Sequence, residues 1–172
     1  MARRELRLPR DLLGHRLRTM LWVEETLAGE ILPELYDHVH AADLKLSLER
    51  HLLETQQHVR TVRRGLELLG ERVVPEPSEA LLGLRREHDE LMRLVGLERH
   101  DVVDLMHAQV IAAGEHLEIA AYEGLRATAN ALGEAEIGSM LQEVLEQEEY
   151  ALELVTRATT KLLAERVESA RL

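Results

Sequence analysis

The sequence predicts an all-α protein, an antiparallel four-helix bundle with one short extra helix between the second and third long helices. Strong helix formers (alanine, leucine, glutamate and arginine) dominate the composition. Apolar residues recur at spacings of three and four along four long stretches, as one buried face of a helix requires. Glycines and prolines separate these stretches, and the shortest breaks require neighbouring helices to run antiparallel.

Length and composition further restrict the class of protein to which the chain can belong. The 172 residues are 45% hydrophobic and 31% charged, which is typical of one domain with a sizeable core. A net charge of −11 argues against a general nucleic-acid binder, and no apolar run approaches the roughly 20 residues of a membrane span. The chain has no cysteine, so disulfides and thiolate metal ligands are excluded. We expect a cytoplasmic protein without nucleic-acid or membrane partners.

The first long helix is predicted to follow a short basic lead-in. Residues 1–12 carry several arginines and one proline and show little apolar periodicity, so we expect the single domain to cover residues 13–172. From Leu13 onward, apolar residues recur at three and four. Pro33 lies inside this stretch, and a proline within a helix removes one hydrogen bond, so we expect a bend there rather than an end.

The second helix and the short helix are bounded by recognisable capping residues. Asp43 is the expected N-cap of the second helix, and Gly70 its C-cap. Residues 73–77 contain two prolines and form the clearest loop. Ser78 is the expected cap of a short helix over residues 79–95.

The last two helices are predicted from the same signals. Gly96 breaks the short helix, and Asp101 is the expected cap of the third long helix, residues 102–132. Gly133 separates it from the fourth, residues 134–168. The tight breaks pair the first helix with the second and the third with the fourth, which is the plan of a ferritin-like bundle with the short helix outside.

Each long helix places at least one carboxylate among its inward-facing leucines, near its middle. On the first helix the apolar stripe fits equally well with Glu24 or with Glu25 turned inward. The polar residues of the other three inner faces are His51, Glu54 and His58 on the second helix, Glu115, Glu118 and Tyr122 on the third, and Glu148 on the fourth.

Carboxylates from four helices at one depth would repel one another strongly unless cations or protons lay between them. Four to six carboxylates with one or two imidazoles are the ligand set of a di-iron or di-manganese site in a bundle core. We therefore expect these glutamates, with His58 or His51, to hold two iron or manganese ions. A shared proton and a buried salt bridge remain alternatives.

Several blocks of the chain form a recognisable set. They are Val23-Glu24-Glu25-Thr26-Leu27-Ala28, Ile31-Leu32-Pro33, His51-Leu52-Leu53-Glu54-Thr55 with His58-Val59, Leu66-Glu67-Leu68-Leu69-Gly70, Glu115-His116-Leu117-Glu118-Ile119-Ala120-Ala121-Tyr122 and Leu141-Gln142-Glu143-Val144-Leu145 with Glu148-Glu149. Over roughly residues 20–160 these blocks resemble the ferritin-like YciE/YciF family, also labelled DUF892. The resemblance implies a metal-binding protein linked to stress responses that handles iron, oxygen or peroxide. It assigns the carboxylates to Glu24 (or Glu25), Glu54, Glu115, Glu118 and Glu148.

The sequence departs from the usual di-iron pattern, which has a histidine three residues after a ligand glutamate on two helices. Gln57 follows Glu54 at that spacing, and Ala151 follows Glu148. Three alternatives stay open: a carboxylate-rich site, a site for one metal, or a degenerate site that has lost its metal.

Two other functions are weighed against the di-metal site. A hemerythrin-type sensor needs a glutamate four residues after a histidine, but Met92 follows His88 and Ala120 follows His116 at that spacing. The stronger rival is a non-catalytic helical bundle that acts through its surface, as a dimer or an assembly subunit, with the apolar run 110–113 serving both core and partner. In either case we expect a homodimer or a higher homo-oligomer.

Overall fold

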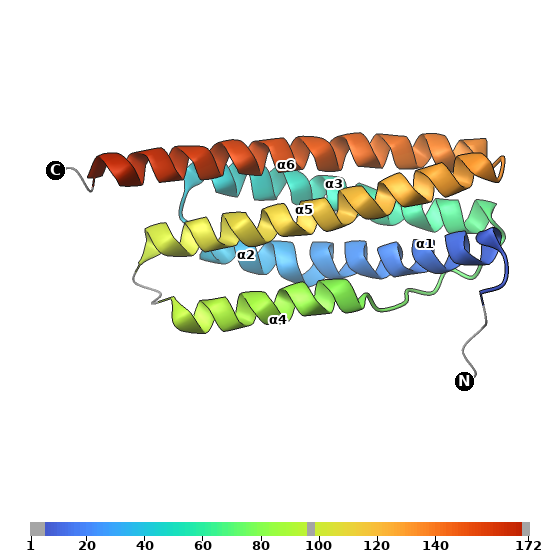
Figure 1. The fold of residues 1–172 in the computed structure, drawn as a ribbon, viewed down its shortest axis with the longest axis horizontal. Helices are drawn as coiled ribbons and strands as arrows, with labels where there is room; N and C mark the ends of the chain where they lie inside the picture. The colour runs from blue at the N-terminus through green and yellow to red at the C-terminus, as the bar shows by residue number, and fades with distance from the viewer. Residues whose placement is uncertain (1–5, 96–98, 170–172) are drawn as a thin grey trace.

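The fold is taken from a computed structural model that describes residues 6–95 and 99–169. In these two ranges every regular element is helical, and the predicted four-helix bundle with a short extra helix is confirmed (Figure 1). α1 packs against α3, α5 packs against α6, and contacts between α3 and α6 join the two hairpins. α4 lies outside the bundle and contacts α5. The elements are α1 (Pro9–Thr26), the single π turn η1 (Leu27–Ile31), α2 (Leu32–His38), α3 (Ala42–Leu68), α4 (Glu79–Leu94), α5 (His100–Ala131) and α6 (Ala135–Ser169).

The first rod of the bundle consists of α1, η1 and α2 in direct succession. It begins at Pro9, before the predicted Leu13, because proline suits the first helical position and the Asp11 carboxylate accepts the Leu8 amide at 3.0 Å. Residues 1–5 of the predicted lead-in lie outside the described residues. The rod continues past Pro33, as predicted, and the local adjustment is the π turn, in which the amide of the following residue bonds five residues back.

The two glycine C-caps and the serine N-cap are confirmed. Gly70 (φ 70°) and Gly133 (φ 79°) both adopt the left-handed conformation that ends a helix. After each of them, the next amide bonds back to the last turn, over 2.9 Å in both cases. The Ser78 hydroxyl accepts the Leu81 amide at 3.3 Å and starts α4. Gly96, the predicted break before α5, lies outside the described residues.

Both predicted aspartate N-caps are wrong. Asp43 and Asp101 lie within the first turns of α3 and α5, and neither helix has a side-chain cap at its N-cap position. The start of α3 is instead held by Asp104 of α5, whose carboxylate accepts the amides of His40 and Ala41 at 2.8 Å each. This cap comes from another helix, so a local sequence rule could not find it.

The bundle interior is apolar at one end and polar towards its middle. Where α1 begins and α3 ends, Leu13, Leu17 and Leu66 are at most 1% exposed, together with Ile137 at the start of α6. Burial of such side chains stabilises the fold by about 1.5–3 kcal/mol each. Within the described ranges, no helix combines the length and apolarity that crossing a membrane requires.

Candidate metal centre

Four helical rods contribute buried side chains to one polar cluster in the middle of the bundle. Glu24 of α1 and Glu148 of α6 are 0% exposed, and Glu115 and Glu118 of α5 are 2% exposed. Glu24 continues the buried stripe of α1 through Leu21, which settles the choice between Glu24 and Glu25 as the inward residue. The π turn begins three residues after Glu24, and π turns are frequent at functional sites.

The imidazoles of the cluster both come from α3. His51 and His58 are 4% and 0% exposed, and they belong to the buried stripe that also contains Thr55 and Val62. They are two helical turns apart, about 10.5 Å of rise. Their rings converge on Glu148, whose carboxylate lies 3.8 Å from His51 Nδ1 and 3.0 Å from His58 Nδ1.

The cluster divides into two groups that share Glu148. We call the first group site A; its ligand atoms lie within 4.8 Å of one another, and it consists of His51, Glu115, Glu118 and Glu148. We call the second group site B; it meets the same distance limit and consists of Glu24, His58 and Glu148. Ligands on opposite sides of a transition-metal ion are about 4–4.4 Å apart, so a small contraction would close either group around an ion.

Two neighbouring side chains orient the ligands of site B. The Tyr122 hydroxyl, which is fully buried, donates a hydrogen bond to Glu24 Oε1. The His58 Nε2 atom lies 2.8 Å from Gln147 Oε1. Because an amide oxygen only accepts, His58 Nε2 carries the proton and Nδ1 faces Glu24 and Glu148. Gln147 was not predicted, because it lies beside the apolar stripe of α6 and has no periodic signal of its own.

Burial and mutual repulsion hold protons on the carboxylates of site A. Burial, followed by the charge of Glu148, raises the pKa of Glu115 well above 4.5, and the same two causes raise the pKa of Glu118. Burial also lowers the pKa of His51, so this ring is neutral. Without metal, the three residues that belong to site A alone, His51, Glu115 and Glu118, are therefore largely uncharged.

An internal ion pair dominates site B. Burial opposes the charged imidazole, but the ion pairs of His58 Nδ1 with the carboxylates of Glu148 and Glu24 raise the pKa of His58 to about 11. Burial would also raise the pKa of Glu148, yet its pairing with the charged His58 ring brings it below 4.5. Burial raises the pKa of Tyr122 well above 10.0, which keeps its hydroxyl protonated as a donor to Glu24.

Seven ligand atoms of the cluster are buried and have no hydrogen-bond partner among the described residues. An unpartnered buried polar atom costs about 1–3 kcal/mol, and native proteins contain few of them. In the described part of the chain, histidines are the only basic residues paired with these carboxylates, so no arginine neutralises them. The residues therefore fit a metal ion. The seven atoms are Glu24 Oε2, His51 Nδ1, His58 Nδ1, Glu115 Oε2, Glu118 Oε1 and both Glu148 carboxylate oxygens.

Glu25 and Glu54, two predicted ligands, are not brought to the cluster. Glu25 is turned one helical position away from Glu24 and pairs with Arg63 of α3. Glu54 lies beside the buried stripe of α3, and its carboxylate accepts Arg50 Nε at 2.9 Å. A nearby arginine satisfies each of these carboxylates at the edge of the bundle, so neither must turn inward.

A four-helix bundle with buried carboxylates and imidazoles at its centre defines a ferritin-like protein with a candidate metal site. The chain belongs to the family described as a domain of unknown function, DUF892, whose profile matches residues 8–168. The resemblance carried by the sequence blocks is thereby confirmed. Comparison with curated proteins finds no match.

Three solved structures share this fold over most of the chain. YcfI from Rhodopseudomonas palustris is 29% identical, with a TM-score of 0.85 over 91% of this chain and 98% of that one. The stress protein YciF from E. coli is 23% identical, with a TM-score of 0.85 over 92% and 99%. A protein from Xanthomonas campestris pv. campestris is 25% identical, with a TM-score of 0.75 over 96% and 100%.

Proposed function

We propose that the chain is a di-metal carboxylate protein that binds two iron or manganese ions and handles iron, oxygen or peroxide. The observation that carries this proposal is the set of seven buried ligand atoms that form no hydrogen bond, between four helical rods. The donors are all oxygen or nitrogen, and this favours iron or manganese over ions that prefer sulfur.

Charge balance supports a pair of divalent ions. When ionised, the four glutamates of sites A and B carry four negative charges, and two divalent cations would neutralise them. Four carboxylates and two imidazoles also match in number the ligand set of ferritin-like di-metal proteins. Here both imidazoles come from α3 and two carboxylates come from α5, so the set is complete without a Glu-x-x-His motif.

With iron bound, the centre would supply electrons for the reduction of oxygen or peroxide. The chain's own residues orient the ligands and exclude water. Tyr122 fixes Glu24, Gln147 fixes His58, and the leucines around the cluster keep the interior dry. The E. coli relative is described as a stress protein, and we propose the same kind of role for this chain.

Elemental analysis tests the proposal. Protein expressed with iron and, separately, with manganese should contain about two ions per chain. Glu115→Ala should lose bound metal and keep its helical circular dichroism spectrum, whereas Glu123→Ala, an exposed glutamate of the same helix, should keep its metal. Metal-free wild-type protein from metal-replete cells, or full metal content in Glu115→Ala, would contradict the proposal.

An interaction bundle with a degenerate site is the second candidate. It is favoured by two large apolar side chains on the surface of α3, Leu46 (68% exposed) and Leu53 (63% exposed). Such residues suit the interface of a homodimer. Light scattering of wild-type protein and of Leu53→Glu tests this surface: the variant should be monomeric if the surface pairs two copies, and unchanged if it does not.

A further inference from the structure

A small pocket lies between α4, the α2 end of the first rod, and α5. Its volume is about 50 Å³. Most of its wall is apolar and comes from Leu27, Ile31, Leu32, Leu35, Leu84 and Ile111. The pocket was not predicted from the sequence, because it forms only where the short outer helix covers the bundle.

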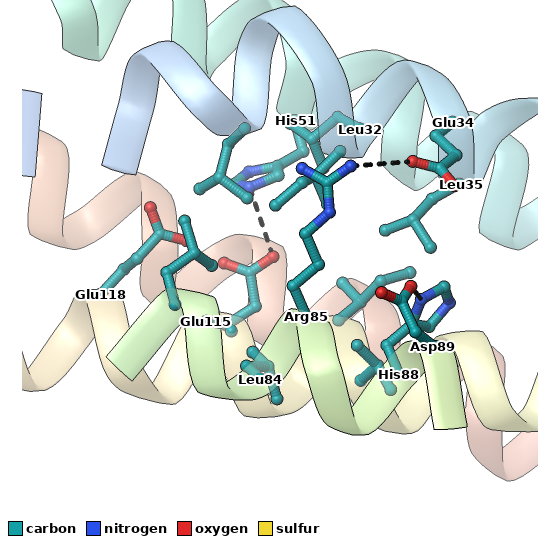
Figure 2. A pocket seen from close by; sticks show the side chains of 16 residues that line it. Leu32, Glu34, Leu35, His51, Leu84, Arg85, His88, Asp89, Glu115 and Glu118 are labelled. Carbon is teal, nitrogen blue, oxygen red and sulfur yellow. Dashed lines mark ion pairs between the residues drawn. The ribbon is translucent and has the colours of Figure 1, made fainter. Parts of the chain in front are cut away.

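The inner end of the pocket is site A. His51, Glu115 and Glu118 line it, and Figure 2 shows their side chains turned towards the space beneath α4. The site B ligands Glu24 and His58 are not among its lining residues. The pocket therefore reaches one of the two ligand groups and not the other.

Charged side chains at the outer rim hold α4 over the pocket. Arg85 of α4 extends across the pocket towards α2 (Figure 2) and pairs with Glu30 at 2.8 Å and with Glu34 at 3.8 Å. Leu81 is the only fully buried residue that α4 contributes to the core. Only a few contacts therefore hold α4 over the pocket.

We propose that this pocket is the binding site and access route for molecular oxygen at site A, an inference that rests on the proposed function. A volume near 50 Å³ accommodates only a few water-sized molecules. The apolar wall disfavours hydrated ions, which would lose their water there. The net charge of −11, with Asp89 at the rim and Arg85 already paired with Glu30 and Glu34, disfavours anions. An uncharged diatomic molecule satisfies all three conditions.

Gly114 of α5 offers a way to close the pocket without touching a ligand. It lines the pocket, and a Cβ added there would lie 3.9 Å from Leu84 Cδ2, an ordinary contact. Gly114→Ala therefore fits, and Gly114→Leu fills the space. Gly124 of the same helix has nothing within 4 Å of an added Cβ, so Gly124→Leu is the matched control for the gain in helix propensity.

Xenon binding tests the pocket in metal-free protein. Xenon is an apolar atom that binds in apolar cavities, and ¹²⁹Xe NMR reports its binding. Wild-type protein and Gly124→Leu should bind xenon, Gly114→Ala should bind it more weakly, and Gly114→Leu should not bind it. Absence of xenon binding in wild-type protein, or equal binding in Gly114→Leu, would overturn the proposal.

Iron oxidation gives the second readout. In protein loaded with Fe²⁺, Gly114→Leu should slow oxidation by O₂ about tenfold or more with unchanged iron content, since access limits the reaction. A wild-type rate in Gly114→Leu would contradict the access route. If wild-type protein bound no metal, the proposed function would fail, but the xenon result would still decide whether the pocket takes an apolar molecule.

Discussion

Sites A and B lie side by side and share Glu148, but the protein builds them differently. In site B, Tyr122 and Gln147 hold the ligand side chains in place. The positive charge of His58 balances the negative charge of Glu148, with which it forms an ion pair. In site A, no described residue outside the cluster orients Glu115 or Glu118, and protons neutralise them. The ligands of site B are held in place without metal, whereas the ligands of site A would gain the most stabilisation from a bound metal ion.

The two sites also differ in their access to the outside. Site A forms the inner end of the pocket beneath α4, and the ligands that belong to site B alone do not line it. A pre-organised closed site is suited to holding an ion tightly, and an adjustable site next to a pocket is suited to exchange and reaction. The predictions below test this division of roles.

Replacement of the shared ligand should have the largest effect. Glu148→Ala removes a donor from both sites and leaves His58 without its nearest carboxylate, so we expect metal content to fall from about two ions per chain to nearly none. Elemental analysis and circular dichroism measure the result. The exposed neighbour Glu149→Ala is the control. Retention of one ion in Glu148→Ala would show that the two sites bind independently.

The stability of the metal-free protein should fall as the pH rises, and both sites should contribute. The raised pKa values of Glu115 and Glu118 in site A and of Glu24 in site B mean that the folded protein keeps protons which the unfolded chain releases near pH 4.5, so stability falls as pH rises above that value. In site B the raised pKa of His58 adds a loss of stability that begins above pH 6.5 and ends near pH 11.

Glu118→Gln tests the contribution of site A to this pH dependence. The variant lacks one of the buried carboxyl groups that keep a proton, so at neutral pH it should be more stable than metal-free wild-type protein. Its stability should fall less steeply as the pH rises above 4.5, and the loss that His58 causes should remain. Urea unfolding over a pH series with a chelator measures this. Parallel curves for wild type and variant would mean that Glu118 is ionised in the metal-free fold.

Sequence periodicity located the helices and most of the inward carboxylates, because both depend on a repeat within one helix. It could not choose between Glu24 and Glu25, since one helical position separates them and the choice depends on Arg63 of another helix. The cap supplied by Asp104, the support from Gln147 and the pocket under α4 likewise arise from contacts between helices. Metal binding by the cluster stays a prediction.

Removal of the Tyr122 hydroxyl should weaken site B alone. Tyr122→Phe keeps the ring that fills the core but takes away the hydrogen bond to Glu24, so we expect the affinity of site B for metal to fall about 10–100-fold. Calorimetric titration should show one weakened step and one unchanged step. Tyr150→Phe, on an exposed position of α6, is the control and should titrate like wild type. Equal weakening of both steps would contradict the separation of the two sites.

Substitution of Glu54 should have the smallest effect, although the sequence blocks assign it as a ligand. Its carboxylate is held by Arg50 at the edge of the bundle, outside both sites. Glu54→Gln should keep both ions and change the free energy of unfolding by about 0.5 kcal/mol, the usual contribution of such an i,i+4 pair. If metal content fell instead, Glu54 must leave Arg50 and turn inward when metal binds. Site A would then gain a fourth carboxylate, from α3, and the contrast between an adjustable and a pre-organised site would become sharper.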